Sequence, residues 1–285
     1  MADTTLIFHV SDIHFGLEDK QAIAWFADEV ARHRPAAVAI TGDLTMRARH
    51  REFAAATAWI TALGVPVTVG VGNHDMPYFN PIERFFAPYR RFRGMREMVE
   101  RELDLPGLAI IPLKTATRAQ PRLNWSKGWV TPAALDLCLA AIDALPPGTR
   151  ALIAVHHPLR EVGTQGTALT RGGTRALEAL ATRPVEAVLS GHVHDAFDIT
   201  EETANGPVRM IGAGTLSQRT RSTPPSFNAL TWSGGKLAVE VRNLQQVATR
   251  DMMIEDVPPD ALPPRHPGEP VAPIGAVPAV DPPVH

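Results

Sequence analysis

The sequence contains little cysteine, no long apolar run and no excess of basic charge. One cysteine among 285 residues excludes a disulfide framework and any metal site built from several thiolates. No stretch approaches the roughly 20 consecutive apolar residues of a membrane-spanning helix, and the N-terminal residues lack the basic region and apolar length of a signal peptide. A formal net charge of −2 argues against binding to duplex nucleic acid or an anionic membrane. The cytoplasm is the expected compartment, because a lone reduced thiol suits it.

Short apolar runs alternate with segments of helical periodicity, which predicts an α/β fold with a mainly parallel sheet. Six runs rich in valine and isoleucine are typical of strands buried on both faces: 6–10, 36–40, 65–71, 151–155, 185–189 and 208–211. Four segments have helical spacing: 20–33, 52–63, 132–145 and 171–182. Cys138 lies in the third of these and is expected to fill the core. A hairpin predicted from 227–232 and 236–241, around Ser233-Gly234-Gly235, makes the sheet mixed.

The C-terminal stretch differs in composition from the rest of the chain. Residues 257–285 contain ten of the 26 prolines and show no periodic apolar pattern. Such a segment cannot bury enough surface to offset the entropy of ordering it. We predict one folded domain over residues 1–256 and a disordered tail over 257–285, with a proline-rich docking segment as the alternative.

Polar clusters follow five of the predicted strands. Ligands of open α/β sheets bind beyond the carboxyl ends of the strands, so we expect these side chains to share one crevice. Two clusters contain a pair at positions i and i+2, and on an extended strand both members of such a pair point the same way. The clusters are Ser11-Asp12-Ile13-His14, Thr41-Gly42-Asp43, Gly72-Asn73-His74-Asp75, His156-His157-Pro158 and Ser190-Gly191-His192-Val193-His194.

Together the clusters offer enough ligands for two metal ions. Two carboxylates, one amide oxygen and four imidazoles are too many for a single tetrahedral site, but one bridging carboxylate would divide them into two sites of four. Nitrogen and oxygen donors without thiolate suit Mn, Fe, Zn, Co or Ni, and paired ions are typical of phosphatases and nucleases. Alone, each motif is more often a turn or a cap; five in order favour metal binding. The candidate ligands are Asp12, His14, Asp43, Asn73, His156, His192 and His194.

The order D-x-H, G-D, G-N-H-D, H and G-H-x-H resembles the calcineurin-like metallophosphoesterase superfamily over residues 7–216. Within it, the chain is most similar to the cyclic-nucleotide phosphodiesterase and glycerophosphodiesterase group. The secondary cues are the segments 9–15, 126–129 and 156–159. The resemblance implies a four-layer αββα sandwich with mixed sheets and a dinuclear metal site at the C-terminal strand ends.

The resemblance also implies a role for each site residue. Asp43 would bridge two divalent ions. His74 would be the catalytic histidine beside the scissile phosphate, and Asp75 the group that orients it. We interpret His157 as structural. One metal would take Asp12, His14 and His194, and the other Asn73, His156 and His192.

The expected activity is hydrolysis of small phosphodiesters, either cyclic nucleotides or glycerophosphodiesters, by attack of a metal-bridging hydroxide. Two divalent ions, two carboxylates and a hydroxide leave a formal charge of about +1, which balances a phosphodiester. Three alternatives remain: a nuclease, a lipid or nucleotide pyrophosphatase of the same superfamily, and a non-catalytic interaction scaffold. We expect neither duplex nucleic acid nor a membrane as a partner.

Several loop residues are candidates for contacting substrate. An arginine could clamp phosphate and Trp125 could stack on a base, although ordinary packing roles are the alternative. The segment 77–101 combines aromatic residues with arginines and could form a helical cap over the site or a homodimer contact. The loop candidates are Arg118, Arg122, Asn124, Trp125, Arg160 and Arg171.

Overall fold

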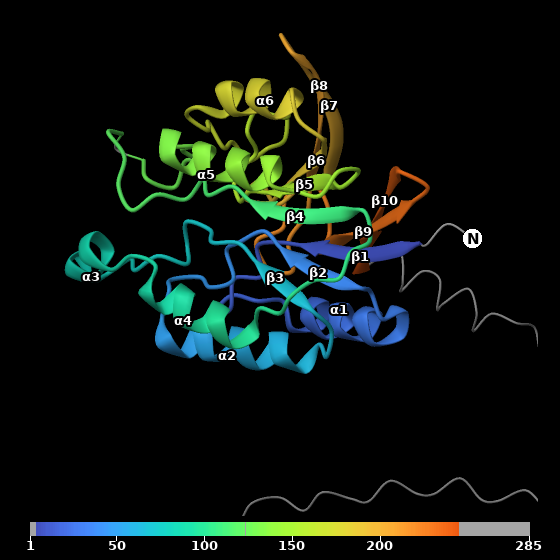
Figure 1. Ribbon diagram of the computed structural model, residues 1–285. Coiled ribbons are helices and arrows are strands. Elements are labelled where there is room, and N and C mark those ends of the chain that lie inside the picture. Colours follow the sequence, from blue (N-terminus) through green and yellow to red (C-terminus); the bar gives the residue numbers. More distant parts are fainter. Residues whose placement is uncertain (1–3, 123, 245–285) are drawn as a thin grey trace, which may run out of the picture. The chain divides into compact units, whose positions relative to one another are not determined.

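Within the part of the chain that the structure describes, ten strands form two sheets of five strands each. The computed structural model describes residues 4–122 and 124–244 (Figure 1); the predicted tail and the boundary at residue 256 lie outside them. The strands are β1 (Thr5–Val10), β2 (Ala37–Ile40), β3 (Val67–Val69), β4 (Leu108–Pro112), β5 (Arg150–Ala154), β6 (Val185–Ser190), β7 (Phe197–Thr203), β8 (Gly206–Gly212), β9 (Ser226–Ser233) and β10 (Lys236–Asn243). The first sheet has the order β10-β9-β1-β2-β3, and the second β4-β5-β6-β8-β7.

Six helices of the described chain cover these sheets. Local sequence explains where several of them begin: Asp19 accepts hydrogen bonds from the first amides of α1, and Thr131 caps α5 just before Pro132. All four predicted helices are present, with ends within two residues of the expected ones. The helices are α1 (Lys20–His33), α2 (His50–Ala62), α3 (Pro81–Phe86), α4 (Arg90–Val99), α5 (Pro132–Asp143) and α6 (Gly173–Ala181).

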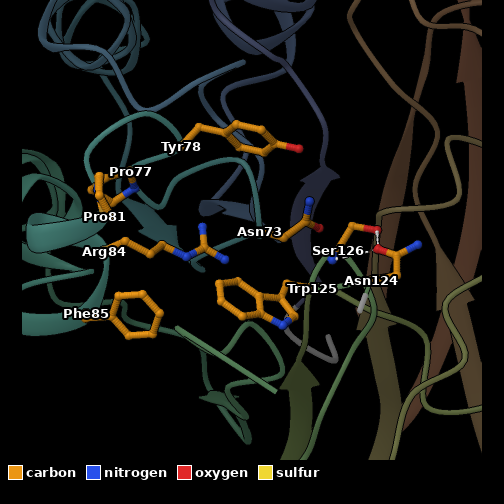
Figure 2. Close-up of a pocket in the computed structure, with 9 residues that line it drawn as sticks. All are labelled: Asn73, Pro77, Tyr78, Pro81, Arg84, Phe85, Asn124, Trp125 and Ser126. Atoms are coloured by element: carbon orange, nitrogen blue, oxygen red, sulfur yellow. Dashed lines mark hydrogen bonds between the residues drawn. The ribbon is translucent and has the colours of Figure 1, made fainter. Parts of the chain in front are cut away.

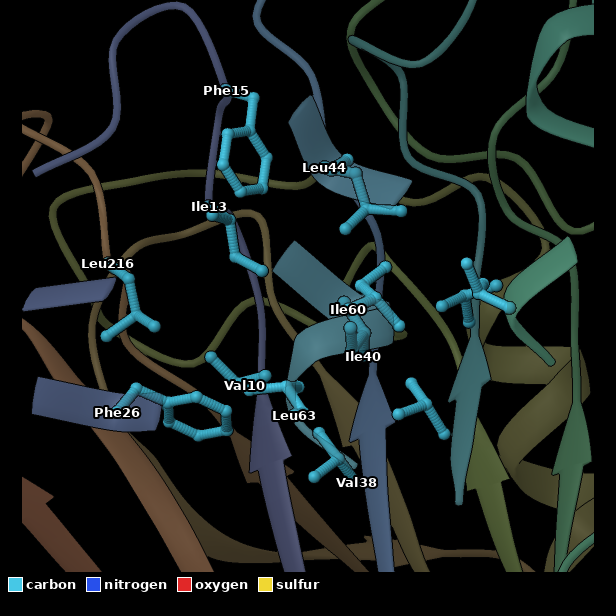
Figure 3. Packing of buried hydrophobic residues seen from close by; sticks show 14 of the residues in the cluster. Val10, Ile13, Phe15, Phe26, Val38, Ile40, Leu44, Ile60, Leu63 and Leu216 are labelled. Carbon is cyan, nitrogen blue, oxygen red and sulfur yellow. The ribbon is translucent and has the colours of Figure 1, made fainter. Parts of the chain in front are cut away.

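Three buried apolar clusters define four layers. One cluster joins the first sheet to α1, α2 and α4 (Figure 3), and another joins the second sheet to α5 and α6. The third cluster contains side chains from both sheets and fills the space between them. Alternation along β1 shows how a strand serves two clusters, since Phe8 and Val10 face the helices while Ile7 faces the other sheet. The αββα sandwich is therefore confirmed.

Strand direction brings the loops of the site to one edge. Strands β1, β2 and β3 run parallel, as do β4, β5, β6 and β8. Strand β9 is antiparallel to β1 and to β10, so the predicted hairpin is present, and β7 is antiparallel to β8. The prediction of a single sheet is wrong, because strand–helix alternation does not reveal where strand pairing stops between β3 and β4.

Two further expectations concern α5 and the segment 77–101. Cys138 is buried in α5, and burial raises the pKa of its thiol to about 12, as expected of a core residue. Helix α4 packs on α2 through Phe92, Met95 and Val99, so it belongs to the core. Helix α3 exposes Ile82 and Phe86, and a homodimer contact there stays a prediction. None of the described helices is long and apolar enough to cross a membrane.

His9 of β1 gives the fold a dependence on pH. Its imidazole is buried between Thr41 and Asn228, and burial lowers its pKa to about 3. Because the unfolded side chain titrates near 6.5, His9 contributes full stability above that pH and loses it as the pH falls toward 3. As the pH falls through that range, protonation of His9 in the unfolded chain should lower the free energy of unfolding by up to about 1.4 kcal/mol per pH unit.

Urea unfolding of the wild type and His9→Gln, with EDTA present so that metal release does not contribute, measures this effect. The stability of the wild type should fall more steeply than that of the variant between pH 6.5 and pH 4. Parallel curves would show that His9 is already protonated in the folded chain.

Candidate metal centre

Five loops bring the seven predicted ligands together at the C-terminal ends of β1, β2, β3, β5 and β6. All seven side chains are buried or nearly so. The first of two groups contains Asp12, His14 and His194. The Oδ1 atom of Asp12 lies 3.1 Å from Nε2 of His194 and 3.6 Å from Nε2 of His14, and the two imidazole nitrogens are 3.3 Å apart. Three ligand atoms therefore converge on one point.

The second group forms around His156. Its Nε2 atom lies 3.2 Å from Oδ1 of Asn73 and 3.2 Å from Oδ2 of Asp43, and its ring stands 5.2 Å from the ring of His192. The same Asp43 oxygen is 3.8 Å from Nε2 of His14 in the first group. Asp43 thus lies between the two groups, where a bridging carboxylate would have to be.

Strained backbone holds these side chains in place. Asp12, His14, Asp43, His192 and His194 have φ values between 51° and 70°, a region that costs non-glycine residues energy and that occurs mostly at functional sites. Our expectation that each i, i+2 pair converges because it extends a strand is wrong, since β1 ends at Val10 and β6 at Ser190. Asp12 and His14 meet through left-handed turns, and the backbone separates His192 and His194 into different groups.

Two glycines allow the loops to approach one another. A Cβ atom on Gly72 would lie 2.0 Å from Oδ1 of Asp43, and one on Gly191 would lie 2.4 Å from Oδ2 of Asp12. Neither space accommodates a methyl group, so both carboxylates depend on glycine in the facing loop.

Hydrogen bonds from the distal ring nitrogens orient the imidazoles. Nδ1 of His156 donates to the carbonyl of Thr41 at 2.9 Å, and Nδ1 of His194 donates to the carbonyl of Arg219 at 2.6 Å. In each ring Nε2 is left to face the carboxylates, which is the usual arrangement of metal-binding histidines. His157 differs, because Thr115 and Ser126 occupy both of its nitrogens. This agrees with our interpretation of His157 as structural.

The charges of the cluster fit cations. Burial lowers the pKa of His156, but the carboxylate of Asp43 more than offsets this and raises it to about 9. Burial raises the pKa of Asp12, yet His194 and His14 bring it well below its usual value. Without a metal, protons on imidazole therefore balance the carboxylates. Oδ1 of Asp12 is buried and faces the ring nitrogens of His194 and His14, and a metal ion between the three atoms would take the place of the protons. The donor set fits two divalent cations.

The structure corrects the role expected of Asp75. Its buried carboxylate accepts hydrogen bonds from Thr45 and from the amide of Gly72, and burial raises its pKa to about 6. The His74 ring is held elsewhere, with Nδ1 donating to the carbonyl of Met46 at 2.7 Å. Asp75 shapes the loop behind His74 rather than orienting the imidazole, because its side chain turns inward to bind backbone amides.

Sequence analysis missed Arg219. Its Nη1 atom lies 3.3 Å from Nε2 of His74, and its side chain lines a cavity of about 260 Å³ above Asp43 and His192, together with Lys127 and Arg221. Arg219 follows β8, which is parallel to β6. The strand-end rule that located the other clusters indicates the loop after this sixth strand, but it does not single out Arg219, which lies seven residues beyond Gly212.

The other loop candidates divide into two kinds. Asn124 and Trp125 line a separate cavity. The arginines meet packing partners instead: Arg118 donates to the carbonyl of Phe85, Arg122 to those of Gly128 and Leu169, Arg160 pairs with Glu201, and Arg171 stacks on Trp129.

Comparisons with known proteins agree with this architecture. The model of the calcineurin-like phosphoesterase family matches residues 5–196, and no curated protein matches the chain. A dimetal phosphatase from Danio rerio is 15% identical with a TM-score of 0.58, over 82% of this chain and 98% of that one. A purple acid phosphatase from yellow lupin (Lupinus luteus) seeds is 14% identical with a TM-score of 0.63, over 85% and 52%. PhoD is 10% identical with a TM-score of 0.57, over 84% and 68%.

Similarity at these identities shows the fold, whereas the family model spans the motifs from Asp12 to His194. The ordered ligands, their convergence at the strand ends and the family match agree with one another. The chain belongs to the calcineurin-like phosphoesterase family.

Proposed function

We propose that this protein hydrolyses small phosphodiesters with a pair of divalent metal ions. The observation that carries the proposal is the position of Asp43, one carboxylate between two groups of ligands. Asp12, His14 and His194 would hold one ion, Asn73, His156 and His192 would hold the other, and Asp43 is placed to serve both. When bound, such a pair supplies Lewis acidity and a nucleophile at neutral pH.

The residues around the metal centre have separate tasks. The contact with the Met46 carbonyl places the proton of His74 on Nδ1, so Nε2 accepts from Arg219. To protonate a leaving oxygen, His74 must first gain a proton on Nε2, which displaces Arg219 from this nitrogen. The freed guanidinium then lies beside the phosphate, where its paired N–H donors suit the non-bridging oxygens.

Two cavities and a charge argument support a small diester as the substrate. The cavity over the metal centre, of about 260 Å³, has room for a phosphate with a small substituent. A second cavity shares Asn73 and Ser126 with the first, so a second organic group has its own place. The formal charge of about +1 on the loaded centre balances one phosphodiester charge.

Arg219 favours a second candidate, the hydrolysis of phosphomonoesters. Its guanidinium adds positive charge to a cavity that Lys127 and Arg221 also line, and a dianion would balance the larger total. The solved structures similar to this chain include proteins described as phosphatases.

A substrate panel tests both candidates. Bis(p-nitrophenyl) phosphate, p-nitrophenyl phosphate, cyclic AMP and glycerophosphocholine would each be assayed with Mn, Zn, Fe or Co. We expect a larger kcat/KM for diesters than for the monoester. The reverse order would favour the monoesterase, and no hydrolysis with any metal would contradict both.

Arg219→Met isolates the contribution of the guanidinium. We expect kcat/KM for bis(p-nitrophenyl) phosphate to fall about 10- to 100-fold, because one charged hydrogen bond to phosphate is worth about 1.5–3 kcal/mol. The metal content should not change, because His194 is held by the backbone carbonyl of Arg219 and not by its side chain. Arg221→Met, which alters the same cavity away from His74, is the control. Equal losses in the two variants would indicate a general effect of charge.

A further inference from the structure

A cavity of about 600 Å³ lies beside the metal centre, between α3 and the loop 124–126. Figure 2 shows Tyr78 and Trp125 on opposite sides of it, with Arg84 and Asn73 between them. Asn73 is a proposed metal ligand, so the cavity begins where the metal centre ends. An organic group attached to a phosphate at the metals would extend into it.

Arg84 is the charged residue among those that line this cavity. Its side chain is nearly buried, at 8% exposure, and no carboxylate of the described residues forms an ion pair with it. The Nε atom of Arg84 donates to the carbonyl of Arg118 at 3.0 Å. The two terminal NH2 groups of its guanidinium point into the cavity (Figure 2). These donors reach the open cavity, where a ligand with acceptor atoms could replace the water that they bind.

Three aromatic side chains also line the cavity. The Trp125 ring lies 5.9 Å from the guanidinium carbon of Arg84 and meets the ring of Phe85 edge-on at 5.8 Å. Tyr78 and Pro81 complete the opposite side. Tyr78 is 67% exposed and Phe85 is 41% exposed, although both side chains are large and mostly apolar. A planar group that entered the cavity would shield both rings from water.

We propose that this cavity is a nucleobase subsite, with the base between Tyr78 and Trp125 and its acceptor edge toward Arg84. The inference rests on the proposed phosphoesterase function and names nucleotide phosphoesters as its substrate class. An acyl chain would fill the apolar walls but leave the donors of Arg84 unpaired. A base provides both a face for stacking and carbonyl or ring-nitrogen acceptors for a guanidinium.

Inhibition by matched ligands tests the subsite. The inhibition constants of GMP and ribose 5-phosphate would be measured with the metal-loaded enzyme against methyl p-nitrophenyl phosphate. The two ligands differ only in the base, and we expect GMP to bind at least about tenfold more tightly, since stacking on one aromatic side chain accounts for that much. Trp125→Leu should remove most of this difference and leave the constant of ribose 5-phosphate unchanged.

Neighbouring phenylalanines of α3 supply a matched control. Phe85 lines the cavity, whereas Phe86 is 85% exposed and does not line it. Phe85→Ala should weaken GMP selectively, and Phe86→Ala should not. Equal inhibition of the wild type by both ligands, or an equal loss in the two alanine variants, would overturn the proposal.

A direct binding measurement separates this inference from the proposed function. Saturation-transfer NMR with guanosine on the metal-free protein needs no hydrolysis, and its signal should fall in Trp125→Leu. Guanosine binding without phosphoesterase activity would retain the subsite and contradict the function. Hydrolysis of phosphoesters without any contribution of the base to binding would support the proposed function and contradict the subsite.

Discussion

Replacing Asp43 with asparagine is expected to empty both metal sites. The Oδ2 atom of Asp43 lies 3.2 Å from Nε2 of His156 and 3.8 Å from Nε2 of His14, so it is the carboxylate shared by the two groups. Asparagine has the same shape but removes one negative charge and one of the ligand oxygens that two cations would share. Metal content should fall from two ions per chain toward none, and kcat should fall with it, because the nucleophile depends on both ions.

Elemental analysis of the purified variant, after dialysis against a metal-free buffer, measures the loss. Asp136→Asn makes the same chemical change on the exposed face of α5 and should keep both ions. Retention of one ion by Asp43→Asn would show that Asp43 serves a single site, and retention of two would contradict its bridging role.

His74→Ala is expected to separate catalysis from metal binding. The imidazole of His74 is hydrogen-bonded to the carbonyl of Met46 and to Arg219. Its ring meets that of His14 edge-on at 4.8 Å, but no hydrogen bond of the His74 ring goes to a proposed metal ligand side chain. Removing it should lower kcat about 10²- to 10⁴-fold, the range for loss of a general acid. Both ions should remain, because the backbone amide of His74, which donates to Oδ1 of Asp43 at 2.8 Å, is unchanged.

Substrates with different leaving groups distinguish the acid from a merely structural residue. An ester of p-nitrophenol needs little protonation, so its hydrolysis should fall less in His74→Ala than that of an alkyl diester. His50→Ala, at an exposed position, is the control. Loss of metal from His74→Ala, or an equal loss of rate for both substrates, would contradict the role.

Much of the fold follows from local patterns in the chain. The strand that precedes Asp12 and the helix that begins after Asp19 were predicted within one residue, because burial on two faces and helix capping are local properties. Strand β7 was missed, since its residues alternate between half-buried and exposed and form no continuous apolar run. Strand β4 was also missed. Helix α4 carries Phe92, Met95 and Val99 at helical spacing, but the segment 77–101 was interpreted only as a cap or a homodimer contact.

The metal centre was predicted as a set of residues but not as a geometry. The spacing of Asp12 and His14 led to the right group for the wrong reason, because left-handed φ values are not visible in a sequence. The same holds for Asp75, whose neighbours in the chain do not show that its carboxylate turns toward Thr45. Arg219 is 145 residues from His74, and chain distance gave no sign of their contact.

By itself, the sequence predicted which side chains could bind the two metal ions, since strand ends, glycines and ligand types are local features of the chain. Only the tertiary structure decided how the side chains are arranged. It places Asp43 between the two groups of ligands, engages both ring nitrogens of His157 in hydrogen bonds and buries Arg84 beside Trp125. The physical reason is that packing two sheets face to face brings together loops that are far apart in the chain. The single cysteine and the small net charge of this protein argued against other kinds of site, and the fold brought the residues of the metal centre together.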